Sequence, residues 1–200
     1  MQVTCRQLVC LELDSSDMKS LPLIHATRLI DPRHKIEQMD LEFTNGELRT
    51  YERIHGSGRE VVVIVPVFDR ETVLLTREYA AGLHRYELGL PRGRVDAGET
   101  LLEGAQRELK EEIGYGAHEL VILRSISLAP TYMSHVAHIV LARNLYEERL
   151  PGDEPEEIEV LPWKLDQLHQ LLTLDEFSEG RAMAALFLAR EWLQQEELAR

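Results

Sequence analysis

Four glutamates lie close together near the middle of the chain. Glu108, Glu111 and Glu112 are spaced at i, i+3 and i+4, and Glu99 precedes them. A helix with a period of 3.6 residues would place the three later carboxylates on one face. Like charges at this spacing destabilise a bare helix, whereas a hard divalent cation such as Mg²⁺ binds carboxylate and phosphate oxygens. The spacing therefore favours a metal site.

The same stretch has a second interpretation, as an ordinary solvated helix face. Arg107, Lys110 and Glu103 could supply surface ion pairs to such a helix. The flanking residues favour the metal site, because the 93–115 stretch fits G-x5-E-x7-R-E-U-x-E-E-x-G-U, where U is a bulky apolar residue. This stretch resembles the Nudix hydrolase signature at every fixed position, with Tyr115 where an aliphatic residue is commoner.

The resemblance implies a role for each matched residue. The metal ligands around one to three Mg²⁺ or Mn²⁺ ions would be Glu108, Glu111, Glu112 and the backbone carbonyl of Arg92. Arg107, on the other side of the helix, would orient a glutamate, and Glu99 would be structural or an outer ligand. Hydrolysis of a pyrophosphate needs charge neutralised on the phosphate oxygens and an acidified water, and divalent ions do both. Gly93 would let the backbone approach the helix without a Cβ clash.

The general base is less well fixed by the sequence. The resemblance implies a glutamate from a mobile loop near the C-terminal end of the sheet. The acidic stretch 153–158 fits that loop, with Glu154 or Glu156 as the base. A solvated loop without a catalytic role is the alternative, and Glu111 is the alternative base.

The wider sequence resembles the ADP-ribose pyrophosphatase branch of the family, and within it the bacterial ADP compounds hydrolases. The segments that carry the likeness are EVVVIVPV, TREYAAG, YELGLPRG, APTY and GDEPE. Pro130 stands sixteen residues after Gly114, as in that branch, and Tyr132 stands near a position where diadenosine-polyphosphate hydrolases carry tyrosine. Ala80 departs from the branch, because an arginine that contacts phosphate is usual there. The candidate substrate-binding residues are Arg53, Arg77 and Tyr132.

We therefore expect divalent-metal-dependent hydrolysis of the pyrophosphate in ADP-ribose, NADH or diadenosine polyphosphates, with release of AMP. ADP-ribose would also yield ribose 5-phosphate. One alternative is a housecleaning pyrophosphatase of nucleoside triphosphates. Another is a non-catalytic module that senses ADP-ribose, although such modules usually lose glutamates that this chain keeps.

The composition limits which partners and which cellular compartment we expect for this protein. The 200 residues carry a net charge of −13, which argues against nucleic acid or an anionic membrane as a main partner. No apolar run approaches the roughly 20 residues of a membrane span, and the N-terminus lacks the pattern of a signal peptide. Cys5 and Cys10 are expected to be reduced thiols of a cytoplasmic protein, and His135 and His138 to be surface or packing residues.

The chain before residue 57 is expected to precede the catalytic domain. Residues 1–20 form a poorly patterned extension, and residues 21–56 a β-hairpin arm. Its expected strands are 25–30, 35–43 and 47–54, with a type I′ turn at Asn45-Gly46. The resemblance implies a homodimer, with this arm as the dimerisation element.

Residues 57–200 are expected to form the Nudix domain. The continuous β-branched run at 60–68 predicts a strand buried on both faces, which should pair with 71–79 through the turn at Asp69-Arg70. The other expected elements are strands at 86–90, 119–127, 135–143 and an edge strand at 158–163, and helices at 100–113, 164–172 and 178–196. Gly114 and Gly116 should end the central helix. We therefore expect an α/β (α+β) fold, an α/β/α sandwich with a mixed central sheet.

Overall fold

The computed structural model describes residues 23–31, 35–56 and 58–199, which form two compact units divided between Arg53 and Ile54. The expected boundary was three residues later, at 56. The extension at 1–20, with Cys5 and Cys10, lies outside the described residues. Among the helices of the described part, none is both long enough and apolar enough to cross a membrane.

The first unit is a three-stranded sheet in the order β1-β2-β3, in which the predicted hairpin is joined by the predicted strand before it. Its strands are β1 (Leu23–Asp31), β2 (Ile36–Glu42) and β3 (Leu48–Ile54), and β1 pairs with β2 antiparallel. All three strands had been expected, within one or two residues at most ends.

The turn between β2 and β3 differs from the prediction. Gly46 has a positive φ of 81°, but Asn45 does not, so the turn is not type I′. The Gly46 amide donates to the Phe43 carbonyl at 2.8 Å, and the Phe43 amide to the Glu47 carbonyl at 2.9 Å. The Asn45 side chain accepts from the Glu47 amide at 3.1 Å. This hydrogen bond favours a longer hairpin loop with glycine alone in the left-handed region.

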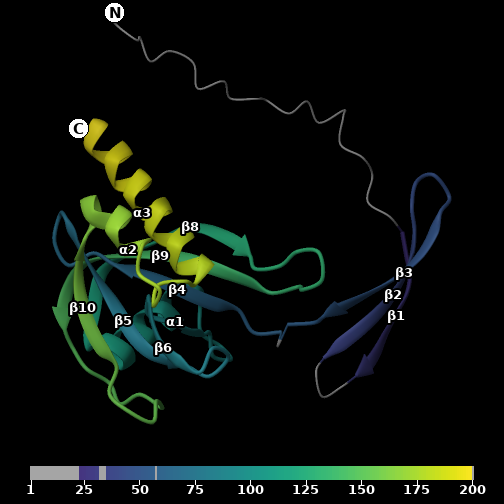
Figure 1. Cartoon of the computed structure of the whole chain (residues 1–200), viewed down its shortest axis with the longest axis horizontal. Coiled ribbons are helices and arrows are strands. Elements are labelled where there is room, and N and C mark those ends of the chain that lie inside the picture. The colour runs from purple at the N-terminus through teal and green to yellow at the C-terminus, as the bar shows by residue number, and fades with distance from the viewer. Residues whose placement is uncertain (1–22, 32–34, 57, 200) are drawn as a thin grey trace, which may run out of the picture. The chain divides into compact units, whose positions relative to one another are not determined.

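The second unit contains two sheets (Figure 1). The first is mixed and has the order β7-β4-β9-β8, with β4 parallel to β9 and the other pairs antiparallel. Its strands are β4 (Val61–Pro66), β7 (Arg92–Arg94), β8 (Tyr115–Ser127) and β9 (Val136–Glu147). The second is antiparallel, in the order β10-β5-β6, with the predicted edge strand at its border. Its strands are β5 (Thr72–Ala80), β6 (Arg85–Gly89) and β10 (Glu159–Lys164).

The predicted pairing of β4 with β5 was largely wrong. The two strands touch through one isolated bridge, between Val67 and Val73, and then enter different sheets. The reason is competition for edges, because β7 and β9 occupy both sides of β4 while β6 and β10 occupy both sides of β5. The mixed sheet was predicted correctly, and the separate second sheet was not.

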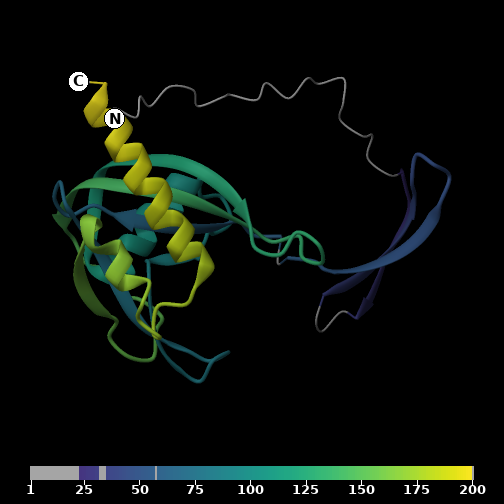
Figure 2. The same cartoon turned by 45° about the horizontal axis from the view of Figure 1, so that its top comes forward.

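Helices cover both faces of the mixed sheet, as expected of an α/β/α sandwich. On one face Val63 packs in a core with Ala185 of α3 (Gly180–Leu198), and on the other Val62 packs with Leu109 of the central helix. Figures 1 and 2 show α3 crossing one side of the sheet and α1 (Leu101–Glu108) on the other. The run predicted to be buried on both faces is β4. Two short helical elements, η3 (Leu165–Gln167) and α2 (Leu168–Leu171), precede α3.

Candidate active site

The central helix is built in two parts. Thr100 caps the start of α1 (Leu101–Glu108), because its side chain accepts from the Glu103 amide while Glu103 accepts from the Thr100 amide. The next turn, η2 (Leu109–Ile113), is π-helical, and Gly114 ends it in the left-handed conformation, with φ 75°. A uniform period of 3.6 residues did not predict this wider turn, a feature frequent at functional sites.

Gly93 allows β7 to pass close to the glutamates, as predicted. A Cβ at this position would overlap the carboxyl group of Glu108. Glu108 is buried, and its carboxylate occupies the space that the glycine leaves open. The other predicted helix-ending glycine, Gly116, lies within β8, where a Cβ would overlap the ring of Tyr146.

Arg107 lies on the glutamate face, and not on the other side of the helix as expected. Its Nη1 donates to Glu108 at 2.8 Å and to Glu111 at 2.9 Å. Its Nε donates to Glu99 at 2.9 Å, and Nη2 to the Arg94 carbonyl at 2.8 Å. The hydrogen bond from Arg107 and one from the Asp96 amide lower the pKa of Glu99. Glu99 therefore holds Arg107, and Arg107 holds two of the candidate ligands.

Glu112 is the most unusual ionisable group of this region. Its side chain is almost fully enclosed, with 3% of the residue surface exposed, and it accepts from the Arg92 amide at 3.1 Å. Burial, reinforced by the charge of Glu78, raises the pKa of Glu112 to about 9. Burial also raises the pKa of Glu108, with the charges of Glu111 and Glu154 adding to the effect and Arg107 opposing it. The helix therefore presents carboxylates that lack enough positive charge around them.

Two further carboxylates converge on Glu112 from outside the helix. Oxygens of Glu78, Glu112 and Glu154 lie within 4.8 Å of one another. Glu78 comes from β5, and its Oε2 is buried without a hydrogen bond, although Arg92 Nη2 lies 2.9 Å away. Sequence reasoning missed Glu78, because only the sheet brings β5 to this helix. The signal available was a glutamate placed inside a strand that is otherwise largely buried.

The backbone of Arg92 faces the same cluster. Pro91 and Val95 exchange hydrogen bonds with β4, through Ile64 N to Pro91 O and Val95 N to Glu60 O. Alternation along an antiparallel ladder turns the amide and carbonyl of Arg92 away from β4, and its amide meets Glu112. The carbonyl predicted as a metal ligand therefore points to the side on which Glu112 lies.

The acidic loop, residues 151–157, brings one of its two candidate bases to the helix. Glu154 joins the cluster with Glu112, and its carboxylate lies where a Cβ of Gly152 would be. Glu156 is not in this cluster and accepts a hydrogen bond from the Tyr86 hydroxyl at 2.6 Å. Of the two predictions, the structure brings Glu154 to the site.

These elements enclose a cleft of about 550 Å³. Seven acidic residues and four arginines line it, together with Gly93, Pro151 and Gly152. The charged lining residues are Glu78, Asp96, Glu108, Glu111, Glu112, Asp153, Glu154, Arg59, Arg92, Arg94 and Arg107. The convergence of Glu78, Glu112 and Glu154 and the raised pKa of Glu112 both indicate an excess of negative charge in this part of the cleft. A hard divalent cation fits this set of oxygen donors.

Two of the three predicted substrate contacts, Arg77 and Tyr132, are not among the residues that line this cleft. Arg77 donates to Glu159 at 2.6 Å and to Glu176 at 3.0 Å, and neither Arg77 nor the exposed Tyr132 lines the cleft. Arg53 belongs to the first unit, where it pairs with Glu37 at 3.0 Å. Within the cleft, the arginines are residues that the prediction had not assigned to substrate.

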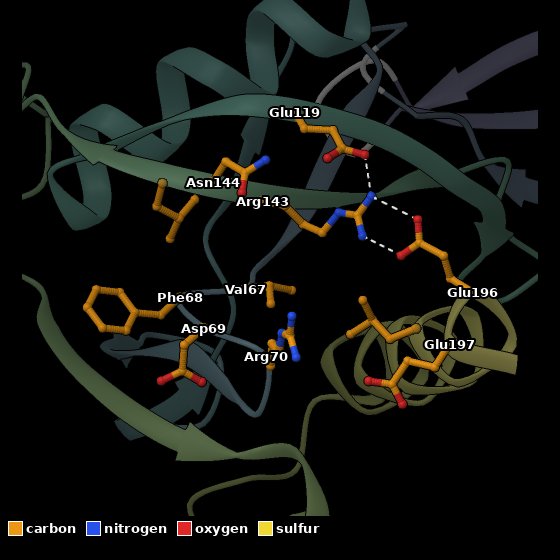
Figure 3. A pocket seen from close by; sticks show the side chains of 11 residues that line it. Val67, Phe68, Asp69, Arg70, Glu119, Arg143, Asn144, Glu196 and Glu197 are labelled. Atoms are coloured by element: carbon orange, nitrogen blue, oxygen red, sulfur yellow. Dashed lines mark hydrogen bonds and ion pairs between the residues drawn. The ribbon is translucent and has the colours of Figure 1, made fainter. Parts of the chain in front are cut away.

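A second cavity, of about 640 Å³, lies where β4 and β9 meet the end of α3 (Figure 3). Its central cation, Arg143, is held between Glu119 and Glu196, with the Glu196 ion pair at 2.6 Å, and lies over the ring of Trp192. Two carboxylates already neutralise this arginine, so we do not assign substrate phosphate to it.

The two histidines singled out in the sequence are outside the cleft. His138 Nδ1 lies 2.8 Å from the Ser125 hydroxyl, and burial lowers the pKa of His135. Both positions agree with packing roles.

Comparisons with known proteins match both units. The family model described as NUDIX domain matches residues 58–186, and that described as NudE-type Nudix hydrolase N-terminal domain matches residues 22–53. The ADP compounds hydrolase NudE of Escherichia coli (strain K12) is 48% identical over 159 residues, which is 80% of this chain and 85% of that protein. The ADP-ribose pyrophosphatase of Bacillus subtilis (strain 168) is 28% identical over 149 residues, 74% of this chain and 80% of that protein. A crystal structure of an ADP compounds hydrolase superposes with a TM-score of 0.81 at 44% identity, covering 90% of this chain and 98% of that one.

Proposed function

Because this chain belongs to the Nudix hydrolase family, we propose that it hydrolyses the pyrophosphate bond of ADP-linked compounds with the help of a divalent metal ion. The names of its relatives, an ADP compounds hydrolase and an ADP-ribose pyrophosphatase, support this substrate class. The observation that carries the proposal is the carboxylate-rich cleft around the buried Glu112. In the reaction, water adds to one phosphorus atom of the pyrophosphate while the bond between that phosphorus and the bridging oxygen breaks. ADP-ribose would give AMP and ribose 5-phosphate.

Mg²⁺ or Mn²⁺ would be held by Glu108, Glu111, Glu112 and the Arg92 carbonyl, with Glu78 as a further donor from β5. When bound, the cation neutralises the non-bridging phosphate oxygens and acidifies the attacking water. This assignment agrees with the donor chemistry, since Mg²⁺ and Mn²⁺ both prefer carboxylate and carbonyl oxygens.

The arginines of the cleft would divide two tasks. Arg107 orients Glu108 and Glu111, because one nitrogen of its guanidinium donates to both carboxylates. Arg59 and Arg94 line the same cleft as the glutamates, whereas Arg77 does not, so they are the better candidates to contact substrate phosphate. Substrate binding by Arg53 and Tyr132 stays a prediction.

Glu154 is the better candidate for the general base. Its carboxylate lies beside Glu112, in the part of the acidic loop that lines the cleft, and would accept the proton of the attacking water. Glu111 is the alternative, but its carboxylate is held by Arg107. Glu156 is bonded to Tyr86 and is assigned no proton transfer.

A homodimer is the second part of the proposal. The sheet of the first unit leaves large apolar side chains on its surface, among them Leu23, Ile24, Leu29 and Leu48. A thin three-stranded sheet has little core of its own, so a second copy of the chain would bury this surface. We place the enzyme in the cytoplasm, where its nucleotide substrates occur.

A substrate panel tests the function. The chain is incubated with ADP-ribose, NADH, diadenosine triphosphate and the common nucleoside triphosphates, with Mg²⁺ or Mn²⁺, and the products are separated by HPLC. Release of AMP from the ADP-linked compounds, lost on chelation of the metal, supports the proposal. Pyrophosphate released from nucleoside triphosphates alone would favour a housecleaning pyrophosphatase, and no product from any compound would refute catalysis.

A further inference from the structure

The acidic loop is tied to the β5–β6 hairpin by one hydrogen bond. The hydroxyl of Tyr86, in β6, donates to Glu156 at 2.6 Å. Tyr86 lies directly across from Tyr79 on β5, with their ring centroids 6.0 Å apart. No role in the cleft accounts for this contact, because neither Tyr86 nor Glu156 lines it.

Glu156, which accepts this hydrogen bond, is two positions from Glu154, the candidate base. Between Glu154 and Glu156 stands Pro155, whose ring fixes its own φ and restricts the backbone of the residue before it. An anchor at Glu156 therefore limits where Glu154 can go. On the other side, the Glu154 carboxylate lies against Gly152, where a Cβ would displace it.

We propose that Tyr86 is a positioning residue, which holds the acidic loop through Glu156 so that Glu154 stays beside Glu112 and Glu78. This inference rests on the proposed function for its consequence in catalysis. It also gives Glu156 a task different from proton transfer, as the anchor of the loop.

The anchor is suited to a loop that opens and closes. Both partners are exposed, with half of Tyr86 accessible to water, so solvent competes with the hydrogen bond. Such a bond shifts the balance between closed and open loops without locking it. Removing this hydrogen bond should lower the fraction of enzyme molecules in which Glu154 is in place. Turnover should therefore fall more than substrate affinity.

The hairpin supplies a matched control. Tyr79 is also about half exposed, and its hydroxyl lies 2.6 Å from Nδ1 of His84, a contact within the hairpin itself. Tyr86→Phe and Tyr79→Phe each remove one hydroxyl from neighbouring rings, and only the first frees the acidic loop.

The first measurement is hydrogen exchange of the amides at 152–158 in the full chain without metal. We expect Tyr86→Phe to raise this exchange several-fold and Tyr79→Phe to leave it as in the unmodified chain. Equal exchange in the unmodified chain and Tyr86→Phe would overturn the inference. Because this readout needs no turnover, it judges the anchor even if the proposed function fails.

The second measurement is steady-state kinetics with ADP-ribose. Tyr86→Phe should lower kcat by about fivefold to tenfold while KM changes less than about twofold. Glu156→Ala should lower kcat by the same factor as Tyr86→Phe, and the double variant should have a kcat no lower than either single variant. Glu156→Gln keeps an acceptor oxygen, so its kcat should stay within about threefold of that of the unmodified enzyme. A loss of several orders of magnitude in Glu156→Gln would instead identify Glu156 as the base.

Discussion

Two clusters of arginine and glutamate in this domain use the same residue types in opposite ways. At the second cavity, Arg143 is held by Glu196 and Glu119, and the hydrogen bonds that it donates to those carboxylates raise its pKa. In the cleft, Arg107 also binds several carboxylates, but Glu112 lies beyond its reach with a pKa raised to about 9.

The difference lies in the balance of charge and burial. The glutamates around Arg143 are a third or more exposed, so water and one guanidinium stabilise them. Glu112 is enclosed and has Glu78 and Glu108 as neighbours. The Arg143 cluster, whose two carboxylates are stabilised by one guanidinium and by water, contributes to stability, whereas a buried excess of carboxylate costs stability until a cation binds.

The largest expected effect comes from Glu112→Gln, which keeps the shape of the side chain and removes its charge. The candidate cation loses a ligand, so kcat/KM should fall by about a thousandfold or more while the fold persists. Glu119→Gln, in the Arg143 cluster, is the matched control and should retain activity within about twofold. Near-normal hydrolysis by Glu112→Gln would refute the metal assignment.

Gly93→Ala should have the next largest effect. The added Cβ overlaps the Glu108 carboxyl group, which must move out of position, and displacements of about 1 Å at a reacting centre cost roughly a hundredfold in rate. Gly82→Ala, where a Cβ would meet nothing, is the control for a general loss of stability. The comparison fails if the two variants have equal kcat/KM.

Part of the candidate site could be predicted from the sequence alone, and part could not. The close approach of Gly93 and the grouping of the helix glutamates were predicted, because they depend on spacing within one continuous segment, whereas the helix face on which Arg107 lies was predicted wrongly. Glu78 was not, because it meets Glu112 only through the packing of a second sheet.

Local backbone geometry set another limit. The π-helical turn at 109–113 and the loop at Asn45-Gly46 depend on individual hydrogen bonds that a residue pattern does not specify. The predicted pairing of β4 with β5 was largely wrong because distant strands compete for the same edges.

A smaller effect is expected in the pH dependence of stability without metal. The pKa of Glu112 is near 4.5 in an unfolded chain and about 9 when folded, so between these values the folded state binds more protons. The free energy of unfolding should therefore fall as pH rises, by about 2 kcal/mol from pH 5.5 to 8, after allowance for relaxation. Urea unfolding in EDTA measures it. Glu112→Gln should flatten this slope, and parallel profiles for the two proteins would contradict the assignment.

The smallest effect is expected at the Arg143 cluster. Arg143→Met removes the charge that joins Glu119 to Glu196 and should lower the free energy of unfolding by about 1 kcal/mol, because both carboxylates can turn to water. Steady-state kinetics should show kcat/KM within about twofold of the unmodified enzyme. A loss of activity comparable to that of Gly93→Ala would mean that the second cavity takes part in catalysis.

The most direct test of the contrast between the clusters is Mn²⁺ binding, followed by the EPR signal of the free ion in the absence of substrate. The unmodified chain and Glu119→Gln should remove Mn²⁺ from solution with the same affinity, and Glu112→Gln should bind it at least about tenfold more weakly. Unchanged binding in Glu112→Gln, or binding lost in Glu119→Gln, would contradict the assignment of the cleft as the metal site.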